Sequence, residues 1–425
     1  MAMRTTSTPA TRPQPAVDDA FDVAVVGAGP AGTTVAALVA EAGVKTLLLE
    51  RAGFPRFHVG ESLVPETYWT LKRLGLVERL KQTAFPKKFS VQFVTETGKE
   101  TAPFYFDEHK PCESSQTWQV IRGEFDQMLL ENAVDKGATA RTDAAVREVL
   151  FDGDRAVGVR AQLSTEPTES AVREIAAKVV VDATGQSAFL ATRLGLKQAD
   201  VRLTKGSVWT YFRGAARDAG KDEGATIILQ TEGKKSWFWY IPLRDDVVSV
   251  GCTGSMSLMF AGGATPEQIF NRERDRCGAI QRRLASAERC TDFFTTKDFS
   301  YKASQAAGPG WVLVGDAFGF IDPVYSTGVF LALKSGEFAA DAICDALRHG
   351  DPSAERLGGW QHSYNEGVEL FRKLVYAFYT PGFSFGDFLR KHPQYRDNLV
   401  DILIGDVFKP RVGEIFDAMG EVLPP

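Results

Sequence analysis

A glycine-rich segment and a later acidic residue carry the clearest chemical signal in this sequence. The segment GAGPAG supplies Gly27, Gly29 and Gly32 directly after the apolar run FDVAVV, and Glu50 ends the next apolar run, VKTLLLE. The first glycine permits a tight turn, the second lets the backbone approach a pyrophosphate, and the third lets a helix pack closely on a strand. The N-terminus of that helix offers free N–H groups to phosphate, and the carboxylate can accept hydrogen bonds from ribose hydroxyls. This arrangement predicts a site for an adenine dinucleotide.

Two tryptophans separated by a single residue form the second signal. They are Trp237 and Trp239, two of the seven tryptophans in the chain, in the stretch SWFWYIPL. Because alternate residues of a strand face the same side, both indoles are expected on one wall. That wall could border a binding site, or the stretch could be an aromatic core strand, and the pattern alone does not distinguish the two.

The elements that must position these residues alternate between strand and helix near the start of the chain. Residues 21–50 read as strand, turn, alanine-rich helix and strand, which is one βαβ unit. Residues 144–181 alternate like a strand meander, and further strand-like runs follow between residues 208 and 299. After Gly350 the chain is helical and rich in phenylalanine. The pattern predicts an α/β nucleotide-binding core with a β-rich insertion and a helical C-terminal extension.

Composition argues against several other classes of protein. The 425 residues carry a net charge of −5 and no basic stripe, which argues against a nucleic-acid partner. Five widely spaced cysteines form no CxxC pair and are expected to be reduced and buried, and five scattered histidines have no metal-ligand spacing, so no metal is predicted. Residues 1–19 lack an apolar signal segment and are expected to be a flexible tail. No apolar run is long enough for stable membrane insertion, and the expected location is the cytoplasm.

Two later segments resemble those of the flavoprotein monooxygenase and halogenase group, whose members have the glutathione-reductase-like FAD-binding fold. KVVVDATGQSAFL, which contains Asp182 and Gly185, resembles the second dinucleotide contact of this family. GWVLVGDAFGFIDPVYSTGVFLAL resembles its GD motif, in which Gly315 and Asp316 would bind the ribityl and phosphate part of the flavin. The resemblance covers residues 21–347 and implies FAD as the cofactor. Besides these residues, the glycines and Glu50, it assigns the following to FAD: Ala31, Arg51, Arg56, Ser62, Arg122, Pro323 and Gly328.

The tryptophan stretch matches the WxWxIP pattern by which flavin-dependent halogenases are usually identified. In that family Trp237 and Trp239 would keep the organic substrate away from the flavin while leaving the flavin open to a small anion. FPKKFSVQF resembles the segment that carries the halogenase catalytic lysine, which falls on Lys88, with Lys87 as the second candidate; a solvated basic pair is the alternative. FPRFHVGESLVP resembles the segment FPRxxxGES of phenol- and pyrrole-type halogenases, which some reductases also carry. In a halogenase Glu61 would act as a general base or orient the lysine.

The segment DPVYSTGVF predicts a halide site. Backbone N–H groups of Thr327 and Gly328, at the start of a helix, could hold chloride or bromide at the favourable end of the helix dipole, or they could serve the pyrimidine edge of the flavin instead. Tryptophan halogenases have a glutamate where this chain has Tyr325. This difference argues against free tryptophan and favours a phenol- or pyrrole-like substrate, free or tethered to a carrier protein.

The expected domains are discontinuous along the chain. The FAD-binding domain is assigned to residues 20–85, 118–200 and 300–348. The substrate domain is assigned to residues 86–117 and 201–299, and a helical C-terminal region to residues 349–425.

Together the resemblances imply a two-component halogenase of secondary metabolism. It would receive reduced FAD from a separate flavin reductase, use O2 and chloride or bromide to make hypohalous acid, and present the halogen at Lys88 to an electron-rich aromatic ring. The chain has no second GxGxxG for a nicotinamide cofactor, which favours a separate reductase. Three alternatives stay open: a geranylgeranyl-reductase-like enzyme, whose family carries a similar aromatic stretch, an aromatic hydroxylase, and a non-catalytic flavoprotein.

Overall fold

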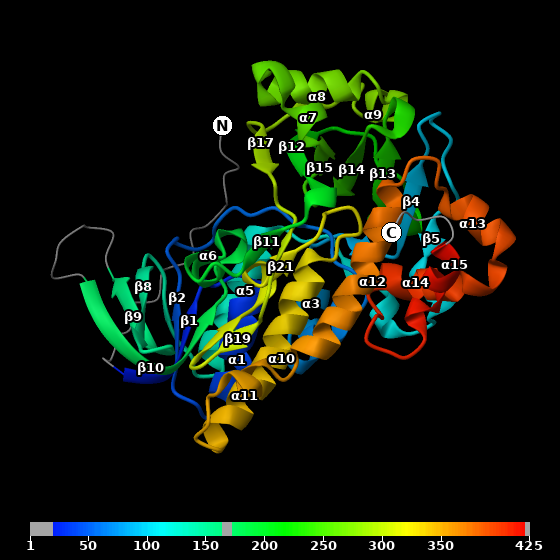
Figure 1. Cartoon of the computed structure of the whole chain (residues 1–425). Helices are drawn as coiled ribbons and strands as arrows, with labels where there is room; N and C mark the ends of the chain where they lie inside the picture. Colours follow the sequence, from blue (N-terminus) through cyan, green and yellow to red (C-terminus); the bar gives the residue numbers. More distant parts are fainter. Residues whose placement is uncertain (1–19, 164–171, 421–425) are drawn as a thin grey trace.

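The computed structural model describes residues 20–163 and 172–420, which form two large β-sheets with helices packed on them (Figure 1). The tail predicted for residues 1–19 lies outside the described residues. One sheet is mostly parallel and the other mostly antiparallel. The α/β class with a β-rich second part, expected from the sequence, is confirmed.

The first sheet carries the glycine segment. Its strand order is β19-β20-β10-β1-β2-β7, and β1 runs parallel to both β10 and β2, while β8 and β9 form an antiparallel hairpin beside β10. β2 is buried along its whole length, which explains its continuous apolar sequence. The strands of this sheet are β1 (Ala20–Val26), β2 (Thr46–Leu49), β7 (Thr139–Arg141), β8 (Ala145–Asp152), β9 (Arg155–Gln162), β10 (Val172–Asp182), β19 (Ala307–Gly308) and β20 (Trp311–Leu313).

Helices α1 (Pro30–Glu41) and α10 (Gly328–Arg348) pack closely on each other beside this sheet (Figure 1). α1 begins with Pro30, whose fixed φ suits the first turn of a helix. The close approach depends on Gly336 of α10, because a Cβ there would lie 2.7 Å from the carbonyl oxygen of Ala31. α5 (Arg122–Asp135) packs on the other side of α1. Small residues therefore set the spacing of the two helices that start at the predicted cofactor and halide segments.

The second sheet is antiparallel apart from one parallel pair, β4 with β13, and its order is β16-β12-β15-β14-β13-β4-β5, with β17 beside β12. In β14 the side chains of Trp237 and Trp239 join the core shared with the first sheet, whereas Phe238 and Tyr240 join a separate core under α8 and α9. The two indoles therefore face the same side, as predicted. The elements are β4 (Ser90–Val94), β5 (Phe104–Tyr105), β12 (Lys205–Arg213), β13 (Thr226–Gln230), β14 (Ser236–Pro242), β15 (Val247–Ser255), β16 (Glu288–Arg289), β17 (Phe294–Lys297), α7 (Met256–Met259), α8 (Pro266–Arg274) and α9 (Gly278–Arg283).

Shorter elements connect the two sheets, and residues 354–420 are mainly helical, as the sequence predicts. β3 (Lys87–Lys88) pairs with β6 (Thr117–Trp118), and a third small sheet contains β11 (Lys197–Ala199), β18 (Tyr301–Ala303) and β21 (Gly319–Phe320). The remaining helices are α2 (Thr67–Arg73), α3 (Val77–Lys81), α4 (Phe106–His109), α6 (Phe189–Arg193), α11 (Ala354–Gly358), α12 (Gln361–Tyr379), α13 (Phe385–Lys391), α14 (Arg396–Ile404) and α15 (Ile415–Met419).

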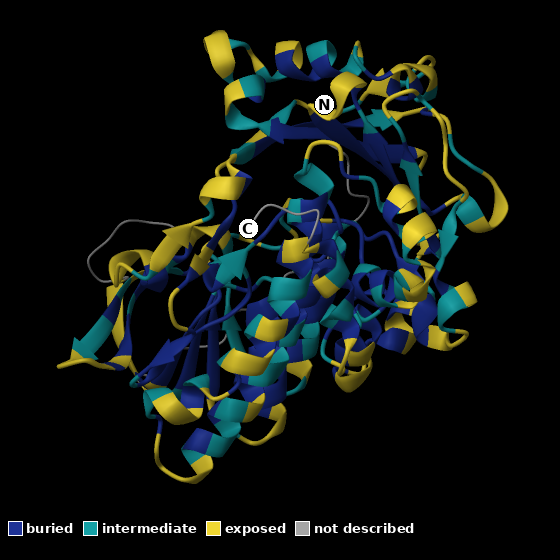
Figure 2. Ribbon diagram, turned by 45° about the vertical axis from the view of Figure 1, so that its right-hand side comes forward, coloured by how far each residue is buried: buried dark blue, intermediate teal, exposed yellow. Residues whose placement is uncertain are grey.

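Burial follows the two sheets, whose strands are largely buried while the outer helices carry exposed residues (Figure 2). The five cysteines are all free, but only Cys252 and Cys277 are buried, so the expectation that all are buried is wrong for the other three. Cys290 and Cys344 are partly buried, and Cys112 is exposed in a surface turn before β6. Within residues 20–163 and 172–420, no helix combines the length and apolar character needed to cross a bilayer.

Candidate active site

A cavity of about 710 Å³ lies between the two sheets and gathers most of the predicted site residues. The first sheet contributes the glycine loop after β1 and the end of β2, and the second sheet contributes residues of β13 and β14. The predicted residues that line it are Gly27, Gly29, Ala31, Glu50, Arg51, Arg56, Glu61, Ser62, Arg122, Gly185, Gly315, Asp316, Pro323, Gly328 and Trp239. The predicted residues outside this lining are Gly32, Lys88, Asp182, Trp237 and Thr327.

The glycine loop is shaped for the close approach of a ligand. A Cβ at Gly27 (φ +104°) would lie 2.3 Å from the Ala183 carbonyl oxygen, and a Cβ at Gly32 would lie 1.9 Å from the Gly27 carbonyl oxygen. The protein's own packing therefore requires these two glycines. A Cβ at Gly29 would have Arg56 Nη2 as its nearest neighbour, at 3.8 Å, so this position is not crowded and faces the cavity. The loop fits a dinucleotide, whose pyrophosphate needs backbone access at the second glycine.

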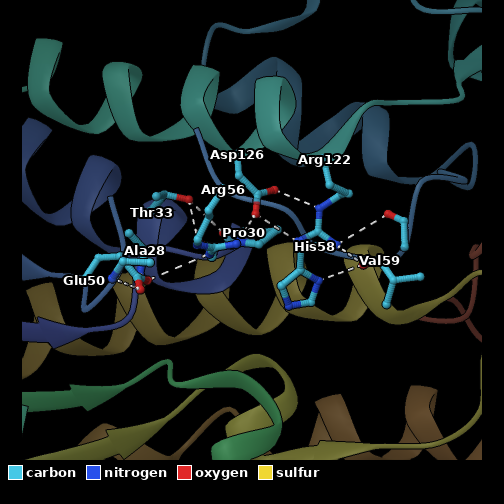
Figure 3. A network of polar contacts seen from close by, with 12 residues as sticks. Ala28, Pro30, Thr33, Glu50, Arg56, His58, Val59, Arg122 and Asp126 are labelled. Atoms are coloured by element: carbon cyan, nitrogen blue, oxygen red, sulfur yellow. Dashed lines mark hydrogen bonds and ion pairs between the residues drawn. The ribbon is translucent and has the colours of Figure 1, made fainter. Parts of the chain in front are cut away.

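Glu50 stands fixed at the end of β2, beside the glycine loop. Its Oε2 accepts a hydrogen bond from the Ala28 N–H at 2.9 Å, and its Oε1 accepts one from the Ala52 N–H at 3.0 Å (Figure 3). Arg56 Nη2 lies 3.8 Å from the same carboxylate. Since each oxygen has a second lone pair, the group keeps capacity to accept ribose hydroxyls from the cavity side.

A single buried carboxylate orients two arginines at the cavity (Figure 3). Asp126 accepts hydrogen bonds from Arg122 Nε at 2.8 Å and Nη2 at 3.0 Å, and from Arg56 Nη1 at 3.2 Å. The charge of the Arg122 guanidinium is the main cause that lowers the pKa of His58 to about 4. His58 Nδ1 lies 2.8 Å from the Val59 carbonyl oxygen, which can only accept, so Nδ1 carries the proton of a neutral ring. The cavity wall thus presents fixed guanidinium groups and an uncharged imidazole.

Asp182 is the last residue of β10 and Asp316 follows β20, and the two carboxylates have different partners. Asp316 lines the cavity, and burial raises its pKa to about 7. Asp182 turns its carboxylate onto its own chain, where it accepts hydrogen bonds from the N–H groups of Thr184 at 2.9 Å and Leu190 at 2.6 Å. The loop that follows Asp182, residues 183–187, does line the cavity. We therefore assign Asp182 a positioning role in place of the direct cofactor contact expected for it.

The halide segment, residues 322–328, meets the cavity at the start of α10. Pro323, Ser326 and Gly328 line the cavity, whereas the Thr327 side chain is buried outside it. Gly328 is the first residue of α10, so the first N–H groups of that helix lack partners from a preceding turn. A helix N-terminus therefore reaches the cavity through Gly328 at the place where the halide was expected.

Glu61 connects the two sheets across the cavity. Its Oε1 accepts a 2.5 Å hydrogen bond from the Tyr211 hydroxyl of β12, and its Oε2 accepts one from the Gly60 N–H at 3.2 Å. Burial raises the pKa of Glu61, and burial together with the Glu61 charge raises the pKa of Tyr211 well above its usual range. A buried carboxyl group with a raised pKa at a cavity wall is suited to proton exchange with a ligand.

Lys88 is buried directly behind the cavity wall. Its Nζ donates hydrogen bonds to Ser62 Oγ at 2.8 Å and to the Leu63 carbonyl oxygen at 3.0 Å, and only 3% of the residue is exposed. Ser62 lines the cavity, and its Oγ lies 2.8 Å from Oγ1 of Thr226, which lines it too. Burial lowers the pKa of Lys88 to about 7, and no carboxylate of the described residues offsets this effect. One hydroxyl therefore separates the amine from the cavity.

Lys87 lies on the opposite side of the same short strand. It is exposed and lines a separate cavity of about 580 Å³, together with Arg217 and Arg244. Gly224 packs against the lysine pair, because a Cβ there would lie 2.1 Å from the Lys87 carbonyl oxygen. The two lysines that the sequence left as alternatives are thus clearly different: only Lys88 contacts a residue of the predicted cofactor cavity.

The two tryptophans also differ in their relation to the cavity. Trp239 lines it, and its Nε1 donates a hydrogen bond to Ser249 Oγ at 3.2 Å. Trp237 packs against Trp239 with ring centroids 6.1 Å apart, and its Nε1 donates to the Tyr379 hydroxyl at 2.8 Å. Trp239 therefore lines the cavity, whereas Trp237 forms a second layer behind it.

Several residues of this site escaped sequence analysis. Gln119 Nε2 donates to Thr226 Oγ1 and to the Gly224 carbonyl oxygen, each at 2.8 Å, and so fixes the hydroxyl that faces Ser62. A buried glutamine inside the apolar run TWQVI was a visible signal for Gln119. The sequence contains no comparable signal for Tyr211 and Thr226, because tyrosine and threonine are both common in strands. Among the described residues, no cluster of acidic, histidine and cysteine side chains could hold a metal ion.

Comparison with known proteins gives matches over nearly the whole chain. The family model described as FAD binding domain matches residues 20–353. A 1H-pyrrole-2-carbonyl peptidyl-carrier-protein chlorinase from Pseudomonas fluorescens is 30% identical over 426 residues, which cover 96% of this chain and 94% of that protein. The corresponding brominase from Pseudoalteromonas luteoviolacea is 30% identical, over 91% of this chain and 92% of its own.

Solved structures agree with this assignment. The flavin-dependent brominase Bmp2 superposes with a TM-score of 0.83 at 29% identity, over 95% of this chain and 99% of that one. The myxobacterial chondrochloren halogenase CndH superposes with a TM-score of 0.80 at 31% identity, over 96% and 98% of the two chains. With a matching family model, full-length relatives and a cavity that fits FAD, the chain belongs to the flavin-dependent halogenases, FAD-dependent oxidoreductases that carry the FAD binding domain.

Proposed function

We propose that this protein is a two-component halogenase that uses O2 and chloride or bromide to halogenate an electron-rich aromatic ring through Lys88. The observation that carries the proposal is the buried Lys88 amine, 2.8 Å from the cavity-lining hydroxyl of Ser62. FAD, supplied in reduced form by a separate flavin reductase, would provide the electrons that let O2 oxidise the halide to hypohalous acid.

Lys88 then receives the halogen. Its nitrogen lone pair attacks the halogen of hypohalous acid, so that an N–halogen bond forms, the O–halogen bond breaks, and the amine proton leaves with hydroxide as water. A carbon of the aromatic substrate next attacks the halogen, which breaks the N–halogen bond; the ring loses a proton and the amine is regenerated. Only the uncharged amine has this lone pair, and burial supplies it by lowering the pKa of Lys88 to about 7.

The wall around Lys88 controls what reaches it. The Ser62 hydroxyl lies between the cavity and the amine, and the Thr226 hydroxyl lies 2.8 Å from it on the cavity wall. A small polar oxidant could pass this boundary by exchanging hydrogen bonds. Trp239 fills the adjoining wall with a rigid indole held by Ser249. This arrangement would let hypohalous acid leave the cavity toward Lys88 and would keep an aromatic substrate, which meets the halogen at Lys88, out of the cavity itself.

The halide and a proton are handled at two other points of the cavity. The start of α10 at Gly328 offers N–H groups to a halide, which offset the cost of removing an anion from water. Glu61, held by Tyr211, would exchange the proton that hypohalous acid formation consumes. Both groups face the cavity, whereas Lys88 lies behind its wall.

We infer the substrate class from the relatives and from one residue. Two of the most similar relatives are named as a chlorinase and a brominase of 1H-pyrrole-2-carbonyl attached to a peptidyl carrier protein. Tyr325 stands where tryptophan halogenases have a glutamate, and it is buried with its hydroxyl turned to the Leu374 carbonyl oxygen. A pyrrole- or phenol-like ring, presented free or on a carrier, fits these observations better than free tryptophan.

The test supplies purified protein with a flavin reductase, NADH, FAD and bromide or chloride. Carrier-bound pyrrole-2-carboxylate and a panel of phenols are offered, and mass spectrometry follows the halogen isotope doublet. We expect halogenated product from the wild type and from Lys87→Ala, and none from Lys88→Ala. Products that gain oxygen without halogen would indicate an aromatic hydroxylase, saturation of a prenyl substrate would indicate a reductase, and no turnover with any substrate would leave a non-catalytic flavoprotein.

A further inference from the structure

The C-terminal end of α12 joins the halide segment to the tryptophan strand. Tyr379 is the last residue of α12, and its hydroxyl accepts a hydrogen bond from Trp237 Nε1 at 2.8 Å and donates one to Asp322 Oδ2 at 3.0 Å. Trp237 belongs to β14, and Asp322 begins the halide segment that leads into α10. One hydroxyl therefore links three segments that are far apart in the sequence.

This link is enclosed by protein. Trp237 and Asp322 are each only 2% exposed. The other carboxylate oxygen of Asp322 accepts the Val324 N–H at 2.9 Å, so the same group shapes the start of the halide segment. Lys205 Nζ covers the Tyr379 ring, 3.7 Å from its centroid. Without the Tyr379 hydroxyl, a buried indole N–H and a buried carboxyl oxygen would each lose a partner, and water has little access to replace it.

Neighbouring side chains contact both sides of the same link. The Phe378 ring packs edge-on against Trp237 and against Tyr325 of the halide segment, with centroids 6.1 Å apart in each pair. Tyr325 in turn donates a hydrogen bond to the Leu374 carbonyl oxygen, one turn earlier in α12, at 3.4 Å. A shift at the end of α12 would therefore move the indole and the halide segment together.

We propose that Tyr379 is a positioning residue that fixes Trp237 and the halide segment relative to each other. Trp237 supports Trp239, which lines the cavity, and Asp322 anchors the loop that ends at Gly328, which also lines it. The Tyr379 hydroxyl thereby fixes the position of the two indoles relative to the start of α10, where the halide is proposed to bind. This inference rests on the proposed function, because the halide segment and the tryptophan wall that Tyr379 links are the parts that bind halide and exclude substrate in that proposal.

The test compares two tyrosines of the same helix. Tyr379→Phe keeps the ring and removes the hydroxyl. Tyr376→Phe is the matched control, since its hydroxyl donates to a different aspartate, Asp200, at 2.7 Å. Oxidised holoprotein is titrated with sodium bromide while the flavin absorbance is followed, and brominated product per O2 consumed is measured in the reductase-coupled assay. We expect Tyr379→Phe to raise the bromide dissociation constant about five- to tenfold and to lower product per O2, and Tyr376→Phe to stay within about twofold of wild type.

Each outcome decides the inference. Equal bromide constants and equal product yields in the two variants would overturn it, and so would a wild type whose flavin absorbance does not respond to bromide. If Tyr379→Phe does not fold, Trp237→Phe removes the donor at the other end of the same hydrogen bond and carries the same expectations. A wild type that binds bromide but brominates nothing would refute the proposed function, while the bromide titration of the variants would still test Tyr379.

Discussion

The two faces of the cavity are built differently. On the first-sheet face, Glu50 is bound by backbone N–H groups and Asp126 by the guanidinium groups of Arg56 and Arg122, so the charged groups there are paired and fixed. On the second-sheet face, where Thr226 of β13 contacts Ser62, the Lys88 amine of β3 lies behind the wall, with a hydroxyl and a carbonyl oxygen as partners and a pKa lowered to about 7. Paired charges hold a ligand, whereas an amine with a lowered pKa can give up its proton and react. The cavity therefore separates binding from reactivity.

Replacing Lys88 is expected to have the largest effect, because it should abolish the reaction without affecting cofactor binding. Because Lys88 lies behind the cavity wall, Lys88→Met should lower halogenated product by at least about 10³-fold while leaving the FAD dissociation constant unchanged. Product is measured by mass spectrometry and FAD binding by flavin fluorescence. Lys87→Met is the control and should retain product within about twofold. Product from Lys88→Met, or an equal loss in the control, would contradict the role of Lys88.

The pH dependence of product yield tests whether Lys88 reacts as an uncharged amine. The lowered Lys88 pKa of about 7 means that the uncharged amine fraction rises as pH increases through 7. Product per O2 consumed should therefore be about tenfold lower at pH 6 than at pH 8. If a charged ammonium instead presented the halogen through a hydrogen bond, the yield would fall over this range. The direction of the change thus distinguishes attack by the amine from hydrogen bonding by the ammonium.

The same shift has a consequence for stability. In the folded state Lys88 has a pKa of about 7 against its ordinary value of 10.5, so between these two pH values the unfolded state binds more protons. The Lys88 contribution to stability therefore rises with pH over this window. Between pH 7.5 and 9.5 the free energy of unfolding in urea should increase less for Lys88→Met than for wild type. Equal increases would contradict the lowered pKa of Lys88.

Much of the first-sheet face could be predicted from the sequence because its signals are local. The glycine loop, the strand before it and Glu50 lie within residues 21–50, and each has a backbone requirement that restricts the residue type. Asp182 shows the limit of such signals. A short carboxylate after a strand can bind a ligand or its own following N–H groups, and the two uses look the same in sequence.

The second-sheet face could be predicted only in part, because its contacts join distant segments. The resemblance to halogenases pointed to Lys88, but its burial depends on Ser62, and Ser62 meets Thr226, which lies 164 residues away in the chain. Thr226 sits in the run TIILQ, where threonine is ordinary for a strand. Nothing in a local pattern says which hydroxyl will face another across a cavity.

A pair of glycine substitutions would test the first-sheet face. Gly27→Ala should destabilise the protein even without FAD, because its Cβ would lie 2.3 Å from the Ala183 carbonyl oxygen at a positive φ. Gly29→Ala should leave the stability of the apoprotein unchanged, since it faces open cavity, and weaken FAD binding about fivefold, or about 1 kcal/mol. Urea unfolding of the apoproteins and flavin fluorescence measure the two effects. Equal loss of apoprotein stability in both variants would contradict the assignment of Gly29 to the ligand.

The smallest expected effect concerns the boundary between the two faces. Thr226→Val keeps the shape of the side chain but removes the hydroxyl that faces Ser62, so a polar oxidant would lose one hydrogen-bonding partner on its way to Lys88. Product per O2 consumed should fall about threefold, with a matching rise in released hydrogen peroxide or hypohalous acid, while FAD binding stays the same. Thr210→Val is a suitable control, because Thr210 is buried in the same sheet but bonds to Thr291. If the two variants give equal yields, the oxidant reaches Lys88 by a route that does not pass the Ser62–Thr226 pair, and the boundary between binding and reactivity lies elsewhere in the cavity.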